Sequence, residues 1–164
     1  MKAIVSVSEE NAIGYTDGRL IYTSNEDFNH FKKVTENSIV VMGRKTFEGM
    51  GNKPLKNRLN LVLSSKDIGY PFTCHSTSQV MKLVTQLPLA DVIVIGGVEV
   101  YKAFIRYIDT FFVTYWDISV GYGLSDIVYL PLEDLLLGFK EVKRTKIRNG
   151  VIVKYERDYE PLDL

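Results

Sequence analysis

Two cations, Arg44 and Lys45, stand where the sequence predicts the first turn of a helix. They follow an apolar run, residues 39–42, which is ended by Gly43 and is typical of a strand buried on both faces. The helix dipole disfavours cations at a helix start, so fold stability alone would not select them there. An anion held by the first-turn amides would reverse that preference. The stretch therefore indicates either an anion site or a basic surface turn after a core strand.

Asp27 is a second candidate for chemistry, on a predicted helix that begins after Ser24. One interpretation is a capping box, in which Ser24 and an acid three residues later satisfy free backbone amides. Asp27, Phe31 and Val34 nevertheless recur at helical spacing, which places the carboxylate on the apolar face. A carboxylate on that face is unfavourable unless it is paired or lines a pocket, so we favour a site role. His30 lies off this stripe and is predicted to be on the surface.

Two further apolar runs end in residues that suit a phosphate-bearing ligand. One ends at Ser64 and Ser65, and the other ends at Gly96 and Gly97, before a predicted helix. The glycines would allow a ligand to approach the backbone closely at a helix start, although such a pair is also common in ordinary turns. The sequence contains neither a G-x-G-x-x-G fingerprint nor a Walker P-loop, which argues against an ordinary Rossmann or nucleotide-hydrolase site.

The remaining patterns predict α/β units that form a largely parallel sheet. A loop with two glycines, residues 13–20, is placed to cover a site at the strand ends. Asn149-Gly150 between two β-type segments predicts a closing antiparallel hairpin. The other predicted elements are strands over residues 2–8, 59–63, 91–95 and 110–116, helices over 76–87 and from 98 onwards, and hairpin strands over 139–147 and 151–155.

The composition is that of an ordinary globular domain. The chain has 164 residues, of which 46% are hydrophobic and 24% charged, and its formal net charge is zero. A nucleic-acid surface would require a basic excess, and no apolar run approaches the roughly 20 residues of a membrane span. Cys74 is the one cysteine, so no disulfide framework or cysteine-rich metal site is expected. We expect a protein of a reducing, cytoplasmic compartment.

Several short motifs occur in a definite order along the chain. They are Ala12-Ile13-Gly14, Asp27-x-x-x-Phe31-Lys32, Val41-Met42-Gly43-Arg44-Lys45-Thr46-Phe47, Leu63-Ser64-Ser65, Val94-Ile95-Gly96-Gly97-x-x-x-Tyr101 and Thr114. In this order and spacing the sequence resembles the dihydrofolate reductase family along nearly its whole length. The motif from Met42 to Phe47 and the Ile-Gly-Gly motif are specific in combination.

The resemblance implies a fold, a reaction and a cofactor. The fold is a single α/β domain over residues 1–164, with a mixed, mostly parallel eight-stranded sheet flanked by helices and a C-terminal antiparallel hairpin. The reaction is the NADPH-dependent reduction of 7,8-dihydrofolate to 5,6,7,8-tetrahydrofolate by hydride transfer to the pterin. The implied partner is this small-molecule substrate, with no metal, nucleic acid or membrane, and the implied state is a monomer.

The resemblance also implies roles for individual residues. Asp27 would bind the pterin's 2-amino group and ring NH, with Thr114 in the same hydrogen-bond network and Tyr22 near an ordered water. Arg58 would pair with the substrate's glutamate carboxylate. The other implied substrate-binding residues are Ile4, Val5, Ser6, Phe28, Phe31, Lys32, Met50, Leu55, Ile95 and Tyr101. The implied cofactor-binding residues are Ile13, Gly14, Leu20, Gly43, Arg44, Lys45, Thr46, Leu63, Ser64, Ser65, Gly96, Gly97, Val98, Glu99 and Val100, with a cis bond between the two glycines.

The chain departs from the family pattern at a few positions. Ile21 and Tyr22 replace the usual Pro-Trp pair, and Asn25 replaces a proline before the helix. Glu99 brings negative charge near the expected pyrophosphate. The altered segment at Tyr22 is the one feature that favours a catalytically silent relative that serves in binding or assembly. The other alternative is a reductase of the same fold that acts on a pyrimidine of riboflavin synthesis, and Asp27 in its motif argues against it.

Overall fold

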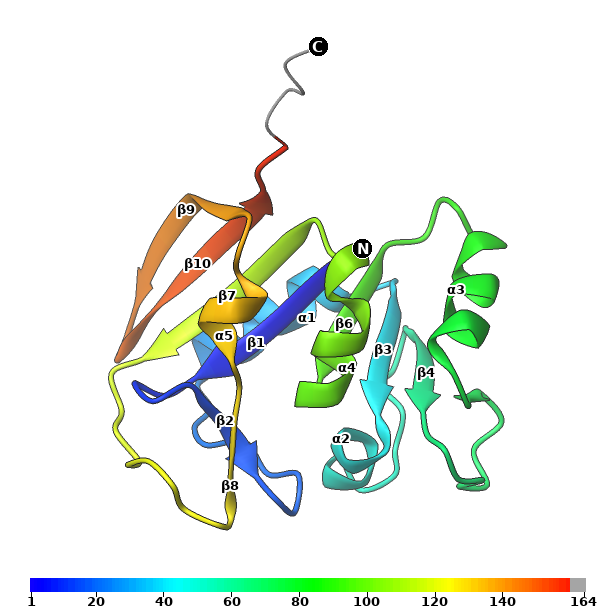
Figure 1. Ribbon diagram of the computed structural model, residues 1–164, viewed down its shortest axis with the longest axis horizontal. Coiled ribbons are helices and arrows are strands. Elements are labelled where there is room, and N and C mark those ends of the chain that lie inside the picture. Colours follow the sequence, from blue (N-terminus) through cyan, green and yellow to red (C-terminus); the bar gives the residue numbers. More distant parts are fainter. Residues whose placement is uncertain (160–164) are drawn as a thin grey trace.

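The computed structural model describes residues 1–159, and an eight-stranded sheet forms its centre (Figure 1). From one edge to the other, its strands are β5 (Thr73–Cys74), β4 (Leu59–Leu63), β3 (Ile39–Gly43), β6 (Val92–Gly96), β1 (Lys2–Val7), β7 (Thr110–Trp116), β10 (Gly150–Arg157) and β9 (Phe139–Ile147). The pairs from β5 to β7 are parallel, and β10 is antiparallel to both β7 and β9. The predicted fold class is therefore confirmed. Residues 160–164 of the predicted domain lie outside the described residues.

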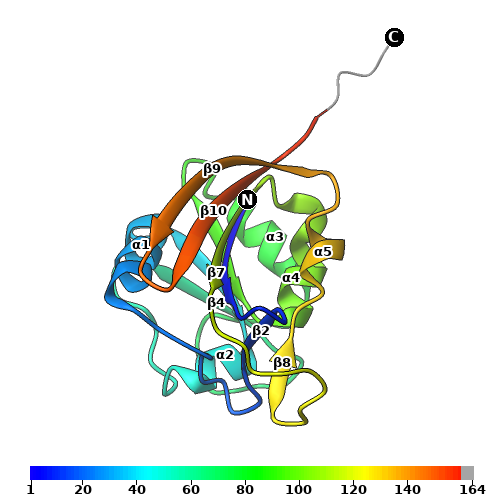
Figure 2. The ribbon, with the colours of Figure 1, turned by 90° about the vertical axis from the view of Figure 1, so that its left-hand side faces the viewer.

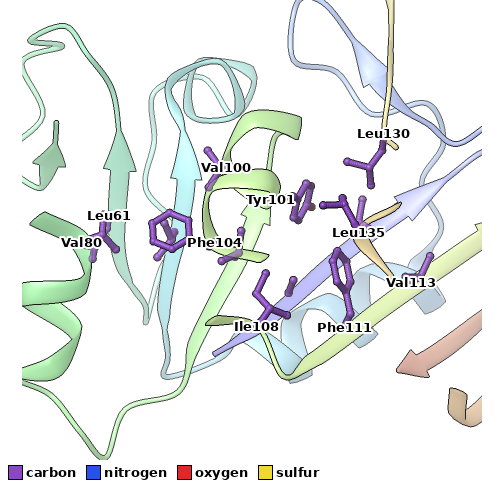
Figure 3. Packing of buried hydrophobic residues seen from close by; sticks show 14 of the residues in the cluster. Leu61, Val80, Val100, Tyr101, Phe104, Ile108, Phe111, Val113, Leu130 and Leu135 are labelled. Carbon is purple, nitrogen blue, oxygen red and sulfur yellow. The ribbon is translucent and has the colours of Figure 1, made fainter. Parts of the chain in front are cut away.

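Helices cover both faces of this sheet (Figure 2). Helix α1 (Asn25–Thr35) lies on one face, and α3 (Thr77–Thr85) and α4 (Val98–Phe104) lie on the other. The larger apolar core fills the space under α3 and α4 and buries Tyr101, Phe104 and Phe111 (Figure 3). Complete burial of one such side chain contributes on the order of 1.5–3 kcal/mol. The Tyr101 hydroxyl donates a hydrogen bond of 2.6 Å to the Ile4 carbonyl, so α4 is held against β1.

The stretch around Gly43 forms the predicted strand and helix. In β3 the residues from Ile39 to Met42 are buried, because parallel neighbours flank the strand and both of its faces are covered. Helix α2 (Arg44–Gly49) begins directly after Gly43. The two cations are therefore in the first turn of a helix, as predicted.

The prediction of an irregular loop over residues 13–20 is wrong at its start. Residues of β2 (Ala12–Tyr15) pair with β8 (Ile127–Tyr129) in a separate two-stranded sheet. Local sequence could not indicate this pairing, because the partner strand lies more than a hundred residues away. The structure also contains the short helices η1 (Ile105–Tyr107) and α5 (Leu132–Leu135).

The C-terminal hairpin turns at Asn149, as predicted. Asn149 adopts a φ of 62°, which asparagine tolerates in tight turns. Strand β10 begins at Gly150 and continues to Arg157, so it is longer than expected. The turn also contacts α1, since the Arg148 amide donates a hydrogen bond of 3.1 Å to the Glu26 carboxylate. Glu26 is exposed, and its bond to this backbone amide is a tertiary contact between α1 and the hairpin.

Glu10 joins the turn after β1 to the loop after β7. Its carboxylate accepts hydrogen bonds from the Ser8 hydroxyl at 2.9 Å, the Val120 amide at 3.0 Å and the Gly121 amide at 3.1 Å. The Ser119 hydroxyl also donates to it. These donors, chiefly Ser119 and the Val120 amide, lower the pKa of Glu10 from its ordinary 4.5 to about 2. The ionised carboxylate therefore ties the two loops together.

We predict that Glu10→Gln destabilises the protein near neutral pH, because an amide nitrogen cannot accept from the backbone donors. The pKa is lower in the folded state, so the stability that Glu10 contributes is present above about 4.5 and is lost as the pH falls towards about 2. Urea unfolding midpoints measured from acid pH up to pH 7 should show that the wild type and Glu10→Gln differ near neutral pH and become equally stable at acid pH. The exposed neighbour provides the control: Glu9→Gln should leave the midpoint unchanged, and an equal effect of both variants would contradict the prediction.

Candidate active site

A cleft of about 1090 Å³ lies along the carboxyl ends of β3, β4 and β6. Ligands of open α/β sheets bind at this edge, because loops and helix starts converge there. This volume slightly exceeds the roughly 300–1,000 Å³ that small-molecule sites occupy. One wall comes from α1 and β1, and the other comes from α2, the end of β4 and the start of α4.

Asp27 lies in this cleft in the third position of α1. Its backbone amide donates a hydrogen bond of 3.1 Å to the Ser24 hydroxyl, so Ser24 caps the helix as predicted. The Asp27 carboxylate accepts a 2.5 Å hydrogen bond from the hydroxyl of Thr114 in β7. Burial raises the pKa of Asp27, while the Thr114 hydrogen bond and nearby His30 oppose that rise. The carboxylate therefore bonds across to the sheet and faces the cleft.

Helix α1 contributes to two separate cavities, so the predicted single apolar face is divided between them. Phe31 lines the cleft together with Asp27, whereas Val34 and His30 line a smaller cavity on the other side of the helix. The prediction that His30 is a surface residue is wrong. Its ring is half-buried and packs edge-on against Phe112, with 5.4 Å between ring centroids. The burial of His30 was not predicted because Phe112 comes from a strand that is distant in sequence.

Basic and hydroxyl side chains gather at the other end of the cleft. Its lining there comprises Arg44, Lys45, Thr46, Ser64 and Ser65. No side chain caps the amides that begin α2 and α4 in the described residues, so these donors remain free for a ligand. The Arg44 guanidinium also donates to Glu48 at 2.8 Å, in a pair that is partly exposed to solvent.

The Gly96–Gly97 peptide bond between β6 and α4 is cis, as the resemblance implied. A Cβ placed on Gly97 would meet only the Thr46 hydroxyl, at 3.8 Å. The space above this backbone is therefore open, and a phosphate could approach it closely. This open backbone, the free amides and the two cations fit the phosphate groups of a dinucleotide.

Apolar side chains line the end of the cleft that contains Asp27. Phe28 there is substantially exposed, at 64%, which leaves apolar surface available for a ligand. The predicted residues that line the cleft are Ile4, Val5, Ser6, Ile13, Gly14, Leu20, Asp27, Phe28, Phe31, Gly43, Arg44, Lys45, Thr46, Met50, Leu55, Leu63, Ser64, Ser65, Ile95, Gly96, Gly97, Val98, Glu99, Val100 and Tyr101.

Four predicted site residues do not belong to that lining: Tyr22, Lys32, Arg58 and Thr114. Thr114 still acts on the cleft, through its hydrogen bond to Asp27. The Arg58 guanidinium donates to the Thr35 hydroxyl at 3.1 Å and to the Lys56 carbonyl at 2.7 Å. Its second terminal nitrogen is not used in these two bonds. The structure records no contact that places Lys32 at the cleft.

Tyr22 does not line the cleft, and its expected place near an ordered water stays a prediction. Its ring packs edge-on against Trp116, with 4.7 Å between centroids. Its hydroxyl accepts a 3.4 Å hydrogen bond from the Asn149 side chain. The hairpin turn therefore provides an alternative partner for this tyrosine, which the local sequence did not reveal.

The cleft also contains residues that the sequence reasoning missed. They are Tyr15, Thr16, Gly18, Arg19, Thr23, Ser24, Gly49 and Val128. For Gly18 and Gly49 the sequence did offer a signal of a place in the cleft, because both glycines lie in or next to predicted site segments. A Cβ on Gly49 would lie 2.8 Å from the Gly18 Cα. Side chains are excluded at this backbone contact, which holds the loop after β2 against the end of α2.

Comparison with known proteins agrees with this architecture. The family model described as dihydrofolate reductase matches residues 1–157. The chain belongs to the dihydrofolate reductase family. A dihydrofolate reductase of Buchnera aphidicola is 28% identical over 159 residues, covering 97% of this chain and 96% of that protein. The type 9 dihydrofolate reductase of Escherichia coli is 31% identical over 123 residues, covering 70% of this chain and 68% of that protein.

A solved structure gives the same result for the fold of this dihydrofolate reductase family member. The dihydrofolate reductase from Enterococcus faecalis, complexed with NADP(H) and RAB-propyl, superposes with a TM-score of 0.76 at 26% identity. The superposition covers 96% of each chain. Within residues 1–159, no cluster of three or more histidine, cysteine or acidic side chains is placed to hold a metal ion. No helix in the same range is long and apolar enough to span a membrane.

We predict that Thr114→Val raises the pKa of Asp27 further. The variant keeps the shape of the buried side chain, which is 1% exposed, but removes the donor that favours the ionised carboxylate. Carbon-13 NMR of the Asp27 carboxyl group across a pH series measures this change. Thr110→Val, on the same face of β7, should leave that titration in place, and an unshifted titration in Thr114→Val would contradict the prediction.

Proposed function

We propose that this chain reduces 7,8-dihydrofolate to 5,6,7,8-tetrahydrofolate with NADPH. The observation that carries the proposal is the half-buried carboxylate of Asp27, bonded to Thr114 at the apolar end of a cleft whose other end is basic. A pterin has an amino group and a ring N–H, and such a carboxylate can accept hydrogen bonds from both. The pyrimidine reductase and the silent relative lose support, because the chain belongs to the dihydrofolate reductase family.

The proposed role of Asp27 is to hold the pterin and favour its protonated form. Burial keeps water from competing for the carboxylate and raises its pKa, so a proton is easier to share at the site. Thr114 fixes one carboxylate oxygen, which leaves the other available to the ring. Ile4, Phe28 and Phe31 supply apolar surface for the planar ring system and the benzoyl group.

The proposed cofactor site is the basic end of the cleft. Bound NADPH would supply the hydride. Arg44, Lys45 and Thr46 would hold its phosphates together with Ser64 and Ser65, and the open Gly97 backbone would admit the pyrophosphate. Glu48 competes for Arg44 in the free protein, but this pair is partly exposed and therefore contributes little.

Arg58 is the proposed partner of the substrate's glutamate carboxylate. Its bonds to Thr35 and Lys56 hold the guanidinium at the end of α1, and its remaining terminal nitrogen can donate to a carboxylate. We also propose that the protein is a monomer of the cytoplasm that acts on a small molecule and not on nucleic acid. The zero formal charge and the single cysteine support this.

We predict that Asp27→Asn slows dihydrofolate-dependent NADPH oxidation at pH 7 by roughly 10²–10⁴-fold, the usual contribution of a positioned acid–base group. The activity should recover partly as the pH falls, because solvent then protonates the substrate. Stopped-flow absorbance measures the rate. Glu26→Gln removes a carboxylate from the same helix outside the cleft and should remain near wild type. A near wild-type rate for Asp27→Asn would leave its carboxylate with no catalytic role.

We predict that Arg44→Ala weakens NADPH binding far more than NADH binding, because NADPH carries an additional 2′-phosphate. A charge-assisted hydrogen bond contributes roughly 1.5–3 kcal/mol, which corresponds to about 10- to 150-fold in Kd. Fluorescence titration with each cofactor measures the two affinities. Lys82→Ala removes a remote cation on α3 and should change neither, whereas equal losses for NADPH and NADH in Arg44→Ala would exclude Arg44 as the 2′-phosphate ligand.

A further inference from the structure

A second cavity of about 390 Å³ lies between α1 and the C-terminal hairpin. Helix α1 lies beside strands β10 and β9, which form one end of the sheet (Figure 2). None of its lining residues belongs to the cleft lining. They are Lys2, His30, Lys33, Val34, Asp91, Phe112, Lys143, Thr145, Ile152 and Lys154. The cavity therefore has walls of its own, formed by α1, β1, β7, β10 and β9.

Four of these residues are lysines, from four different elements. Lys143 and Lys154 are directly opposite each other on β9 and β10, an arrangement in which like charges destabilise a sheet. Lysines on edge strands commonly prevent aggregation, which would explain Lys143 alone. It does not explain Lys154 or Lys2, which lie on strands in the interior of the sheet.

Acidic neighbours offset only part of this charge. Lys2 pairs with Asp91 at 3.6 Å, and Lys154 pairs with Glu156 at 3.4 Å. Asp91 is the one carboxylate in the lining. The cavity consequently keeps a positive potential, which a bound anion would neutralise.

His30 adds a polar group that lacks a partner. Its Nε2 atom is buried and has no hydrogen-bond partner within residues 1–159, and buried polar atoms of this kind usually have one. Burial lowers the pKa of His30, and Lys33 adds to this effect while Asp27 opposes it. The charged groups on the elements around the ring are Asp27, Lys33, Lys2, Asp91, Lys143 and Lys154.

We propose that this cavity binds an organic phosphomonoester, with its phosphate among the lysines and His30 and its apolar body against the cavity floor. Ammonium groups bind phosphate as compact point charges, and a phosphate dianion neutralises more of the lysine charge than a carboxylate would. The apolar surface comes from Val34, Phe112 and Ile152. A phosphate dianion beside His30 favours its protonated ring, so binding raises the pKa of this histidine.

The test is a proton–carbon NMR titration of the imidazole signals with phenyl phosphate. The chain has two histidines, so the His30 signal can be assigned with a His75→Gln variant. We expect a saturable shift of the His30 signal and a higher His30 pKa in the ligand-bound protein. Phenyl phosphate should bind more tightly than inorganic phosphate. Equal affinity would overturn the assignment of an organic ligand, and an equal shift with sodium chloride at matched ionic strength would overturn the site.

Matched variants locate the response. Lys143→Gln should weaken phenyl phosphate binding by roughly two- to fivefold, as removal of one exposed charge contact would. Lys146→Gln changes another exposed lysine of β9, one that does not line the cavity, and should leave the affinity unchanged. Arg44→Ala, in the cleft, should also leave it unchanged. If either control weakened binding as much as Lys143→Gln, the anion would be held elsewhere and the proposal would fail.

Discussion

The hydrogen bond from Thr114 to Asp27 links the first helix to the centre of the sheet. It allows a half-buried carboxylate to face an apolar pocket, where desolvation alone would favour its neutral form. The two residues lie 87 positions apart, so the bond forms only when α1 docks against β7. Replacing the carboxylate by a neutral group would remove the cost of burying a charge, so a ligand explains its position better than stability does.

The parallel arrangement of β3, β4 and β6 makes the rest of the site possible. Parallel strands end at a common edge, so residues following Gly43, Leu63 and Gly96 converge although they are distant in sequence. Helices α2 and α4 begin at this edge and present free amides. Cations at a helix start, such as Arg44 and Lys45 on α2, reduce helix stability. Their charge is favourable when a phosphate ligand binds there.

Helix α1 separates two environments of different character. One flank presents Asp27 and Phe31 to the cleft, and the other presents His30 and Lys33 to the basic cavity. The charges of Asp27 and His30 act on each other within one helix. An anion in the cavity would therefore alter the electrostatic surroundings of the Asp27 carboxylate. The hairpin contacts the same helix through the hydrogen bond from the Arg148 amide to Glu26.

The sequence alone was sufficient for the features that depend on local pattern. The buried strand before Gly43, the Ser24 cap and the turn at Asn149 follow from periodicity and residue chemistry, and all are present. Folate and NADPH followed from resemblance and not from these patterns. Only the tertiary structure decided the rest. The β2–β8 pair, the Glu10 bonds to the distant loop and the packing of Tyr22 against Trp116 depend on segments far apart in sequence. Local propensity has no information about such partners, because their energies arise only when the packed elements bring the side chains together.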